Sequence, residues 1–554
     1  MTLFEPGNPH SFKMMCGQAG WRVLLGMSLG LGPLLAVSCS RTSDASRSAA
    51  VQEASPGVAT AWSEELFDYA VENLNRLEQF QSKSMLKQIV DRLNQWIPSQ
   101  VAPADWKPDP LLATLPKAIS GLPQLQELRT MHFSSEDGLA LREVIWLRDV
   151  SLWARGTTVD ELSRARNLFD WTVRNIQFAA TGRDRSRPAW NLPQTPSETL
   201  LFGQGTAMDR AWVFVLLCQQ QGIEAAVLVP TPLVGVLANG HCYLFDPTVG
   251  LPVPARDGVK LDRSEQLDIR PATLDEAAGD DHILRQLDVN KSYPYPVKAV
   301  QLKGLTAMIV ASPESLSLRM KLVEARTAGQ QKAVFSIDAS SRAHRWKQVA
   351  GVSDAQLWAH PFEIVRSRSH ECRSELQQWL VRLLPFDAVL GGNLWKGRLL
   401  HLKGILAGEE GASRIYQNVR PSNDDLLHDE GRRAEKYFKA ARNQRPAVAA
   451  AELEAVARKQ AAQETAIVQW AKQAATYWLG LVAYERQDHA DSIDYLEKRT
   501  LEAAPSSFWT RGAKYNLARA YEASGQRNKA IEHYREAESD WGAQLRANWL
   551  AKRK

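Results

Sequence analysis

The clearest hydrophobic pattern in the chain lies in residues 203–254. Small and polar residues over GTAMDR precede apolar residues that recur at helical spacing, namely Ala211, Phe214, Val215 and Cys218. This spacing predicts a core helix that begins near Thr206. An apolar run over residues 225–229 follows, and Asn239-Gly240 then separates two strand-like runs. That dipeptide is the strongest short-range signal for a two-residue hairpin turn.

The hairpin turn fixes the pairing of its two strands. Ala238 is expected opposite His241, so Leu233 lies opposite Asp246, and Thr231 lies diagonally next to the Asp246 carboxylate. Because side chains alternate along a strand, His241 and Asp246 are expected to point to opposite sides of the hairpin.

These residues resemble the motifs of the transglutaminase-like, papain-related superfamily. In that superfamily G-x-C-x-[DE]-x-A opens a helix, H-A-W opens a strand, and D-P-T ends the next strand. Asp209 and Ala211 match the helix motif, and Asp246-Pro247-Thr248 matches the last motif. The upstream stretch ARNLFDWTVRNIQF is similar to the helix that precedes the site in the superfamily. The resemblance covers residues 165–254.

Two of the three catalytic side chains that the resemblance implies are missing. Ala207 stands at the position of the cysteine and Thr231 at that of the histidine. Covalent catalysis of this kind needs a thiolate and an imidazole, with a carboxylate to orient the ring. Asp246 alone remains, so the resemblance implies a degenerate site with no catalytic residue.

Two cysteines in the same stretch are weak substitutes. Cys218 lies about three helical turns beyond Ala207 on the apolar face, where a thiol is usually an inert core side chain. Cys242 lies about 13 Å along the strand from Asp246. A histidine from a distant part of the chain is the remaining route to an active site.

The N-terminus carries a secretory pattern. Lys13 and Arg22 precede an apolar run over residues 23–37, which is shorter than the roughly 20 residues that span a bilayer. Residues 36–39, AVSC, resemble a bacterial lipobox, and this resemblance implies lipidation of Cys39. A plain signal peptide and an uncleaved anchor are the alternatives.

A self-similar pair of segments lies near the C-terminus, at residues 477–505 and 513–539, and its equivalent residues Ile493 and Ile531 are about 38 apart. The pair resembles the tetratricopeptide repeat (TPR), which stacks paired helices and commonly binds peptides on its concave face. On that resemblance, the candidates for a peptide groove are Tyr515, Arg519 and Glu522. Two repeats are marginal alone, so helices from Leu394 onward are expected to complete a solenoid.

We therefore predict a multidomain α+β protein. The expected order is a signal peptide with lipobox (1–39), a flexible tether (40–60), a helical region (61–155), a transglutaminase-like α+β domain (156–300), a small α/β unit (301–392) and a helical TPR-like solenoid (393–554). Residues 183–199 are expected to form a loop. Within the small unit, the pattern predicts helices over 313–329, 341–349 and 371–384, and strands over 333–338 and 355–365.

Composition narrows the function further. The 67 basic and 62 acidic residues are spread along the chain, which gives no argument for nucleic-acid binding. Phosphate-binding, zinc and serine-hydrolase motifs are absent, and His344, His360 and His370 lack metal-ligand spacing. No metal or cofactor is expected. The five cysteines are widely spaced and do not suggest a disulfide framework.

The sequence favours a non-catalytic bacterial protein that is anchored in the cell envelope as a lipoprotein. It would face the periplasm or the exterior and bind peptides or proteins, and a secreted form is the alternative. Two other functions remain open. One is an active transglutaminase or cysteine hydrolase with an unrecognised Cys/His pair near Asp246, and the other is a structural scaffold without a groove.

Overall fold

The computed structural model describes residues 56–79, 83–178, 193–329, 333–369, 381–387 and 390–552. The expected signal peptide, the lipidation site Cys39 and most of the tether lie outside these residues. His370 and most of the helix predicted over 371–384 lie outside them as well.

Three long helices form most of the expected helical region: α1 (Pro56–Asn75), α2 (Lys83–Trp96) and α5 (Ser135–Ala154). Helix α1 begins inside the segment that was expected to be a tether. Its buried residues include Phe67, Ala70 and Leu74, whereas Tyr69 is 52% exposed. The short turn η2 (Leu77–Gln79) lies between α1 and α2. Between α2 and α5 the chain forms η3 (Ile97–Ser99), η4 (Pro110–Thr114), α3 (Lys117–Ser120) and α4 (Pro123–Gln126).

A six-stranded mixed sheet lies at the centre of the α+β part, with the strand order β10-β9-β3-β4-β5-β6. The strands are β3 (Glu224–Val229), β4 (Leu233–Ala238), β5 (His241–Asp246), β6 (Leu251–Pro252), β9 (Leu305–Ile309) and β10 (Val352–Leu357). Neighbours pair antiparallel except β9 and β10, which are parallel. Two small two-stranded sheets accompany it: β1 (Gln177–Phe178) with β2 (Gln204–Gly205), and β7 (Pro254–Leu261) with β8 (Leu267–Pro271).

The sheet is covered on both faces, as its apolar strands require. On one face, Val234, Val236 and Phe245 pack with residues of α6 (Glu161–Asn175) and α8 (Ala207–Gln220). On the other face, Leu233, Leu244 and Leu305 pack with residues of α9 (Leu274–Gly279), α10 (Asp281–Arg285) and α12 (Ala339–Trp346). These two apolar layers place the candidate site residues, because each strand alternates between them.

The predicted small α/β unit needs correction. Strands β9 and β10 belong to the same sheet as β3–β6, so the expected boundary at residue 300 does not separate two sheets. Residues 333–338 form no strand, and α13 (His360–Ser369) replaces most of the strand predicted over 355–365. The helix predicted from residue 313 begins as the short turn η7 (Glu314–Leu316), and α11 (Leu318–Thr327) follows.

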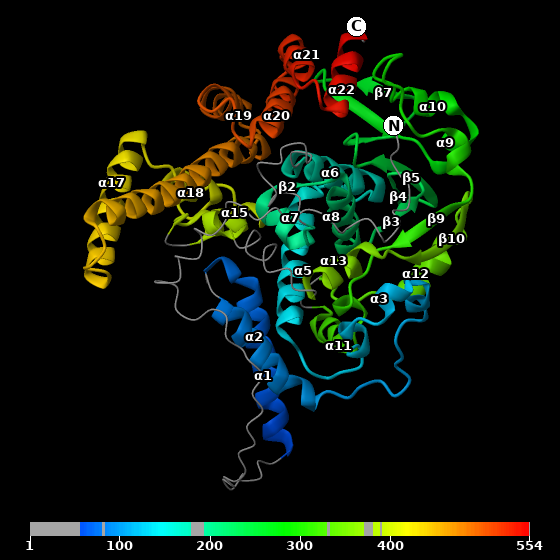
Figure 1. Ribbon diagram of the computed structural model, residues 1–554. Helices are drawn as coiled ribbons and strands as arrows, with labels where there is room; N and C mark the ends of the chain where they lie inside the picture. Colours follow the sequence, from blue (N-terminus) through cyan, green and yellow to red (C-terminus); the bar gives the residue numbers. More distant parts are fainter. Residues whose placement is uncertain are drawn as a thin grey trace. The chain divides into compact units, whose positions relative to one another are not determined.

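Helices dominate the chain from Leu394 onward, as predicted. They are α15 (Leu394–Leu402), α16 (Ala412–Asn418), α17 (Asn423–Gln444), α18 (Ala450–Glu485), α19 (His489–Leu496), α20 (Thr510–Ala523), α21 (Arg527–Glu536) and α22 (Trp541–Lys552), with a π-helical turn (Glu497–Glu502) after α19. From α17 on, each helix packs against the next, and Figure 1 shows α17 and α18 as a long pair of helices. The described residues form one compact unit.

Candidate functional site

Helix α8 begins where the sequence predicts, at a capping box. The Thr206 hydroxyl accepts from the backbone N–H of Asp209 at 3.2 Å, and the Asp209 carboxylate accepts from the backbone N–H of Thr206 at 2.8 Å. An added Cβ on Gly205 would lie 2.8 Å from the Cβ of Asp209, so the close approach favours glycine there. Burial raises the pKa of the Asp209 carboxyl. Asp209 therefore holds the helix start.

Ala207 is the first residue of α8 and is half-buried, between the exposed residues Thr206 and Met208. This is the place at which the superfamily motif has its nucleophile. A methyl group at the positive end of the helix can neither attack a carbonyl group nor carry a proton.

The β4–β5 hairpin has the predicted register. Asn239 and Gly240 have φ values of 51° and 79°, which is the left-handed conformation that a type I′ turn needs at both positions. Ala238 pairs with His241, and Val234 pairs with Phe245. The pairing inferred from Asn239-Gly240 is therefore confirmed.

Asp246 lies on the sheet face opposite α8. The ring of its neighbour Phe245 lies 5.3 Å from the ring of Phe214 on α8 and 5.1 Å from that of Phe169 on α6. Since side chains alternate along β5, Asp246 projects into the other apolar layer, where it meets Tyr295. The Asp246 carboxylate and the core-facing side of α8 therefore lie on opposite faces of the sheet.

Both oxygens of the Asp246 carboxylate have partners. The Tyr295 hydroxyl donates to Oδ2 at 2.6 Å. The backbone N–H groups of Thr248 and Val249 donate to Oδ1 at 2.7 and 3.1 Å, so the D-P-T motif forms a closed turn. The side chain is 0% exposed, and burial raises the pKa of its carboxyl. This carboxylate holds a turn and is not placed to orient an imidazole.

Thr231 forms hydrogen bonds within the turn that connects β3 to β4. Its hydroxyl donates to the carbonyl oxygen of Leu228 at 2.6 Å and accepts from the backbone N–H of Leu233 at 3.4 Å. No hydrogen bond joins it to Asp246 in the described chain. Thr231 and Asp246 therefore have separate structural roles, each in its own turn.

The two cysteines of this region are free, buried thiols. Burial raises the pKa of Cys218 far above its ordinary value and that of Cys242 to about 12. Among the described residues, no histidine hydrogen-bonds either thiol. Both cysteines have the surroundings of inert core residues.

The ring of His360 packs against α8. It lies 5.4 Å from that of Trp212 on α8 and 5.0 Å from that of Trp358. Burial lowers the pKa of His360 to about 4, so this imidazole is neutral at physiological pH. Within the described ranges, no group of three or more His, Cys, Asp or Glu side chains is arranged to hold a metal ion.

The segment before α8 contains a helix that the sequence did not predict. Residues 183–199 were expected to be a loop; of these, residues 183–192 lie outside the described ranges, and Pro196 begins helix α7 (Pro196–Phe202). Thr195 and Glu198 form a second capping box, and the Thr195 backbone N–H donates to Glu198 at 2.8 Å. The sequence T-P-S-E is itself a capping-box signal with proline at the first helical position. The many polar residues around it favoured the prediction of a loop instead.

A small polar cavity lies where the first half of the chain meets the C-terminal helices. It has a volume of about 10 Å³, and its polar side chains include Arg210 of α8, Arg511 and Tyr515 of α20, and Asp540 before α22. Phe178 and Val249, which follow α6 and Asp246 in the chain, also line it, as do Val173, Gln177, Gly512 and Asn516. Sequence reasoning missed this cavity because its residues are spread from position 173 to position 540.

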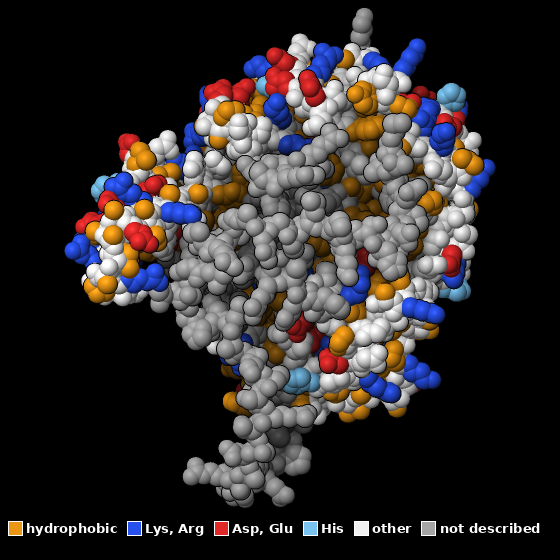
Figure 2. Space-filling view, viewed as in Figure 1, with side chains coloured by type: hydrophobic (Ala, Val, Ile, Leu, Met, Phe, Trp, Pro, Cys, Tyr) orange, Lys and Arg blue, Asp and Glu red, His pale blue; other side chains and the backbone are white. Residues whose placement is uncertain are grey.

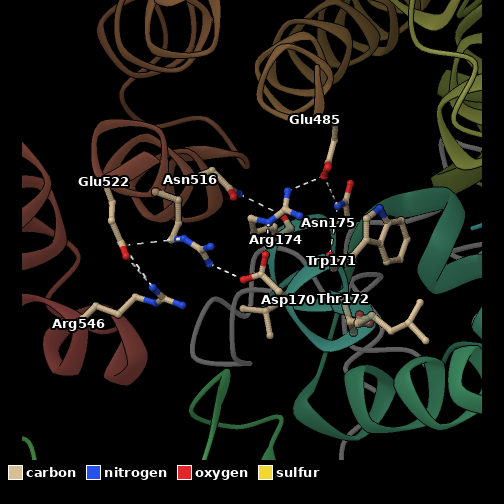
Figure 3. Close-up of polar contacts among 12 residues, drawn as sticks. Asp170, Trp171, Thr172, Arg174, Asn175, Glu485, Asn516, Glu522 and Arg546 are labelled. Carbon is tan, nitrogen blue, oxygen red and sulfur yellow. Dashed lines mark hydrogen bonds and ion pairs between the residues drawn. The ribbon is translucent and has the colours of Figure 1, made fainter. Parts of the chain in front are cut away.

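Beside the cavity, an ionic network connects α6 to the helical part (Figure 3). Asp170 accepts from Arg519 of α20 at 2.6 Å and from Arg174 at 2.8 Å. Arg174 also pairs with Glu485 at the end of α18. Burial alone would lower the pKa of Arg174, but the charges of Glu485 and Asp170 raise it. The network fixes α6 against two helices that lie more than 300 residues later.

The residues predicted to line a peptide groove lie in or next to this network. Glu522 pairs with Arg546 of α22 at 3.2 Å and accepts from the backbone N–H of Leu267 at 3.0 Å. Tyr515 and Glu522 are 6% and 5% exposed, and the Arg519 side chain is 11% exposed. The assignment of Tyr515, Arg519 and Glu522 to an open peptide groove is therefore corrected, since other parts of the chain cover them.

The described surface carries both signs of charge. Figure 2 shows basic and acidic side chains intermixed on the face in view, without a broad region of one sign. This matches the nearly balanced composition. In the part of the chain that the structure covers, no helix is long and apolar enough to cross a bilayer.

Comparison of the chain with protein-family models, with curated proteins and with solved structures finds no match. The resemblance to transglutaminase-like and TPR proteins therefore depends on the residues and motifs alone.

Proposed function

We propose that this chain is a non-catalytic binding protein of the bacterial cell envelope. In this proposal a degenerate transglutaminase-like part and TPR-like helices act as one body that recognises a peptide or a protein. The observation that carries the proposal is the environment of Asp246. Asp246 is the one member of the motif triad that remains. One of its carboxylate oxygens accepts hydrogen bonds from a turn, and the other accepts one from Tyr295.

The state of the thiols supports the absence of catalysis. A cysteine nucleophile needs a lowered pKa and partial access to solvent. Cys218 and Cys242 are buried, and burial raises the pKa of each. An acid, a thiol and an imidazole do not meet in the described part of the chain.

Support for binding comes from the α17–α18 hairpin. Only part of each helix is covered, and Leu427 and Val456 remain 69% and 57% exposed. Exposed apolar side chains on two neighbouring helices could pack against the apolar face of a partner helix. The ionic network supplies a fixed support, because it joins α18 and α20 to the α+β part.

Two variants of the full-length protein test the binding role. We expect Leu427→Asp together with Val456→Asp to abolish capture of a partner from envelope extracts, because charge is introduced on the binding helices. Leu139→Asp is the matched control, since Leu139 is also exposed, at 45%, but lies on α5. Equal capture by all three proteins would contradict a binding role for this hairpin.

Membrane attachment has a separate test. Intact mass spectrometry of protein made in a lipoprotein-producing bacterium should find acyl chains on Cys39 at a new N-terminus. Cys39→Ser should leave the chain unacylated. A wild-type protein without acyl mass would contradict the lipoprotein assignment and favour the secreted alternative.

A further inference from the structure

We propose that the polar cavity between α8 and α20 binds one carboxylate group through Arg210, Arg511 and Tyr515. This inference depends on the proposed function, because it names the chemistry by which a peptide or protein ligand would be held. A C-terminal carboxylate and an acidic side chain are the two sources of such a group.

The cavity contains hydrogen-bond donors that the described chain leaves without partners. The hydroxyl of Tyr515 and the Nε of Arg511 are both buried and lack a hydrogen-bond partner there. Tyr515 is only 6% exposed, and both residues line the cavity. Buried polar groups in native proteins nearly always have a partner, so two such donors in one cavity indicate a missing acceptor.

Arg210 adds a buried positive charge to the same wall. Its Nε donates to the carbonyl oxygen of Ile176 at 2.7 Å, and its Nη2 donates to that of Val173 at 3.3 Å. Across the described ranges no carboxylate forms an ion pair with it. Burial lowers the pKa of Arg210 to about 10. The charge of Asp540 opposes this shift, and the charge of Arg511 adds to it. A second anion beside both arginines would offset the remaining cost.

Both guanidinium groups pack against the ring of Phe178. The guanidinium carbon of Arg210 lies 3.7 Å from the centroid of the Phe178 ring, and that of Arg511 lies 4.9 Å from it. Asp540 is the one acidic residue in the wall, and its Oδ1 already accepts from the backbone N–H of Ala543 at 3.0 Å. Two cations and one anion leave the cavity with a net positive charge.

The size of the cavity limits how far an anion can enter. A volume of about 10 Å³ corresponds to about one water-sized group. One oxygen of a carboxylate fits this space, and its carbon and second oxygen would lie at the opening of the cavity. A water molecule would satisfy the donors but would not neutralise the charge.

The test measures thermal unfolding of the full-length protein at constant ionic strength, with sodium acetate replacing sodium chloride. Ligands that bind only the folded state raise Tm with concentration, so acetate should raise Tm above the chloride value. Acetamide, which is neutral and of similar shape, should not. Arg511→Gln and Tyr515→Phe should each weaken the acetate effect at least about tenfold in concentration. Arg535→Gln, an exposed arginine on α21, should leave it unchanged.

Several outcomes would overturn the proposal. Equal Tm values in acetate and chloride would mean that water or any anion serves the cavity. An acetate effect that persists in both Arg511→Gln and Tyr515→Phe would place the binding elsewhere. Neither result bears on catalysis, so the failure of this site is distinguishable from the failure of the proposed function.

If acetate binds, short peptides identify the source of the carboxylate. A glycine-rich peptide with a free C-terminus should raise Tm at lower concentration than its C-terminally amidated form. The same amidated peptide with one glutamate should restore the effect only when an acidic side chain is the natural group. Either positive result supports carboxylate binding, and failure of both peptides to raise Tm contradicts a role for the cavity in peptide recognition.

Discussion

The hydroxyl of Tyr295 donates a 2.6 Å hydrogen bond to the buried carboxylate of Asp246, on the face of the sheet that α8 does not cover. This relationship explains why an aspartate in a D-P-T motif need not be catalytic. The carboxylate closes the turn after β5 and anchors Tyr295, and both tasks are structural. In this chain, the aspartate that matches the catalytic motif has a role in the fold.

Removing the Tyr295 hydroxyl should destabilise the fold. Tyr295→Phe leaves Oδ2 of Asp246 buried without its side-chain donor, so we expect a loss of about 1–3 kcal/mol in the free energy of unfolding, measured with urea. Tyr293→Phe is the control, because Tyr293 is 63% exposed, and its loss should be within about 0.5 kcal/mol. Similar values for the two variants would contradict a structural role for this bond.

Glu143 of α5 should give the protein a pH-dependent stability. Its carboxylate accepts from the backbone N–H of Ser197 at 2.8 Å, and burial raises its pKa from 4.5 to about 7. Because the folded-state pKa is raised, the stabilisation is complete below pH 4.5 and is lost as the pH rises through 7.

The variant Glu143→Gln keeps an acceptor but cannot ionise. Relative to wild type, it should gain stability between pH 4.5 and pH 7, by on the order of 2 kcal/mol after allowance for partial exposure to solvent. Urea unfolding at a series of pH values measures the difference. A constant difference across this range would show that Glu143 does not titrate as expected.

The ion pair between Arg174 and Glu485 should be important for joining the two halves of the chain. Their side chains are 7% and 11% exposed, and removal of one partner leaves a buried charge with fewer contacts. We expect Glu485→Gln to cost about 3 kcal/mol of unfolding free energy.

Glu454→Gln is the matched control for that experiment. Glu454 pairs with Arg458 on α18 at 2.6 Å, but both side chains are more than half exposed. Its removal should change stability by less than about 0.5 kcal/mol. A large loss in the control, or none in Glu485→Gln, would contradict the importance of the buried pair.

Two helical glycines should respond to alanine with opposite signs. An added Cβ at Gly480 of α18 would lie 2.7 Å from Cγ of Leu496, whereas one at Gly431 of α17 would meet nothing within 4 Å. Gly480→Ala should therefore destabilise the protein by about 1–3 kcal/mol, and Gly431→Ala should stabilise it by about 0.5–1 kcal/mol. Thermal unfolding of both variants measures the signs. Stabilisation by Gly480→Ala would contradict the close packing of α18 on α19.

Local signals in the sequence predicted the core of the α+β part. Thr206 and Asp209 satisfy the first N–H groups of α8, and Asn239-Gly240 permits positive φ at both turn positions. These effects act between residues close in the chain, so periodicity and capping rules detect them. The helical nature of the C-terminal third followed in the same way.

The predictions that were wrong concern contacts between residues far apart in the chain. Strand β10 pairs with β9 more than 40 residues away, and such pairing leaves little trace in a local pattern. Arg519 and Glu522 look like exposed groove residues on their own helix, but α6 and α22 bury them. The carboxylate-binding cavity escaped notice for the same reason, because only the folded chain brings Arg210 and Arg511 to the same ring.

Turnover is the most direct test of the absence of catalysis. Purified full-length protein is incubated with a primary amine and a glutamine-containing peptide, and both amide exchange and hydrolysis are followed by mass spectrometry. The same assay is run on Cys218→Ser and on an active transglutaminase as positive control. We expect the wild type and Cys218→Ser to give no product. Product that depends on any cysteine of this chain would contradict the account.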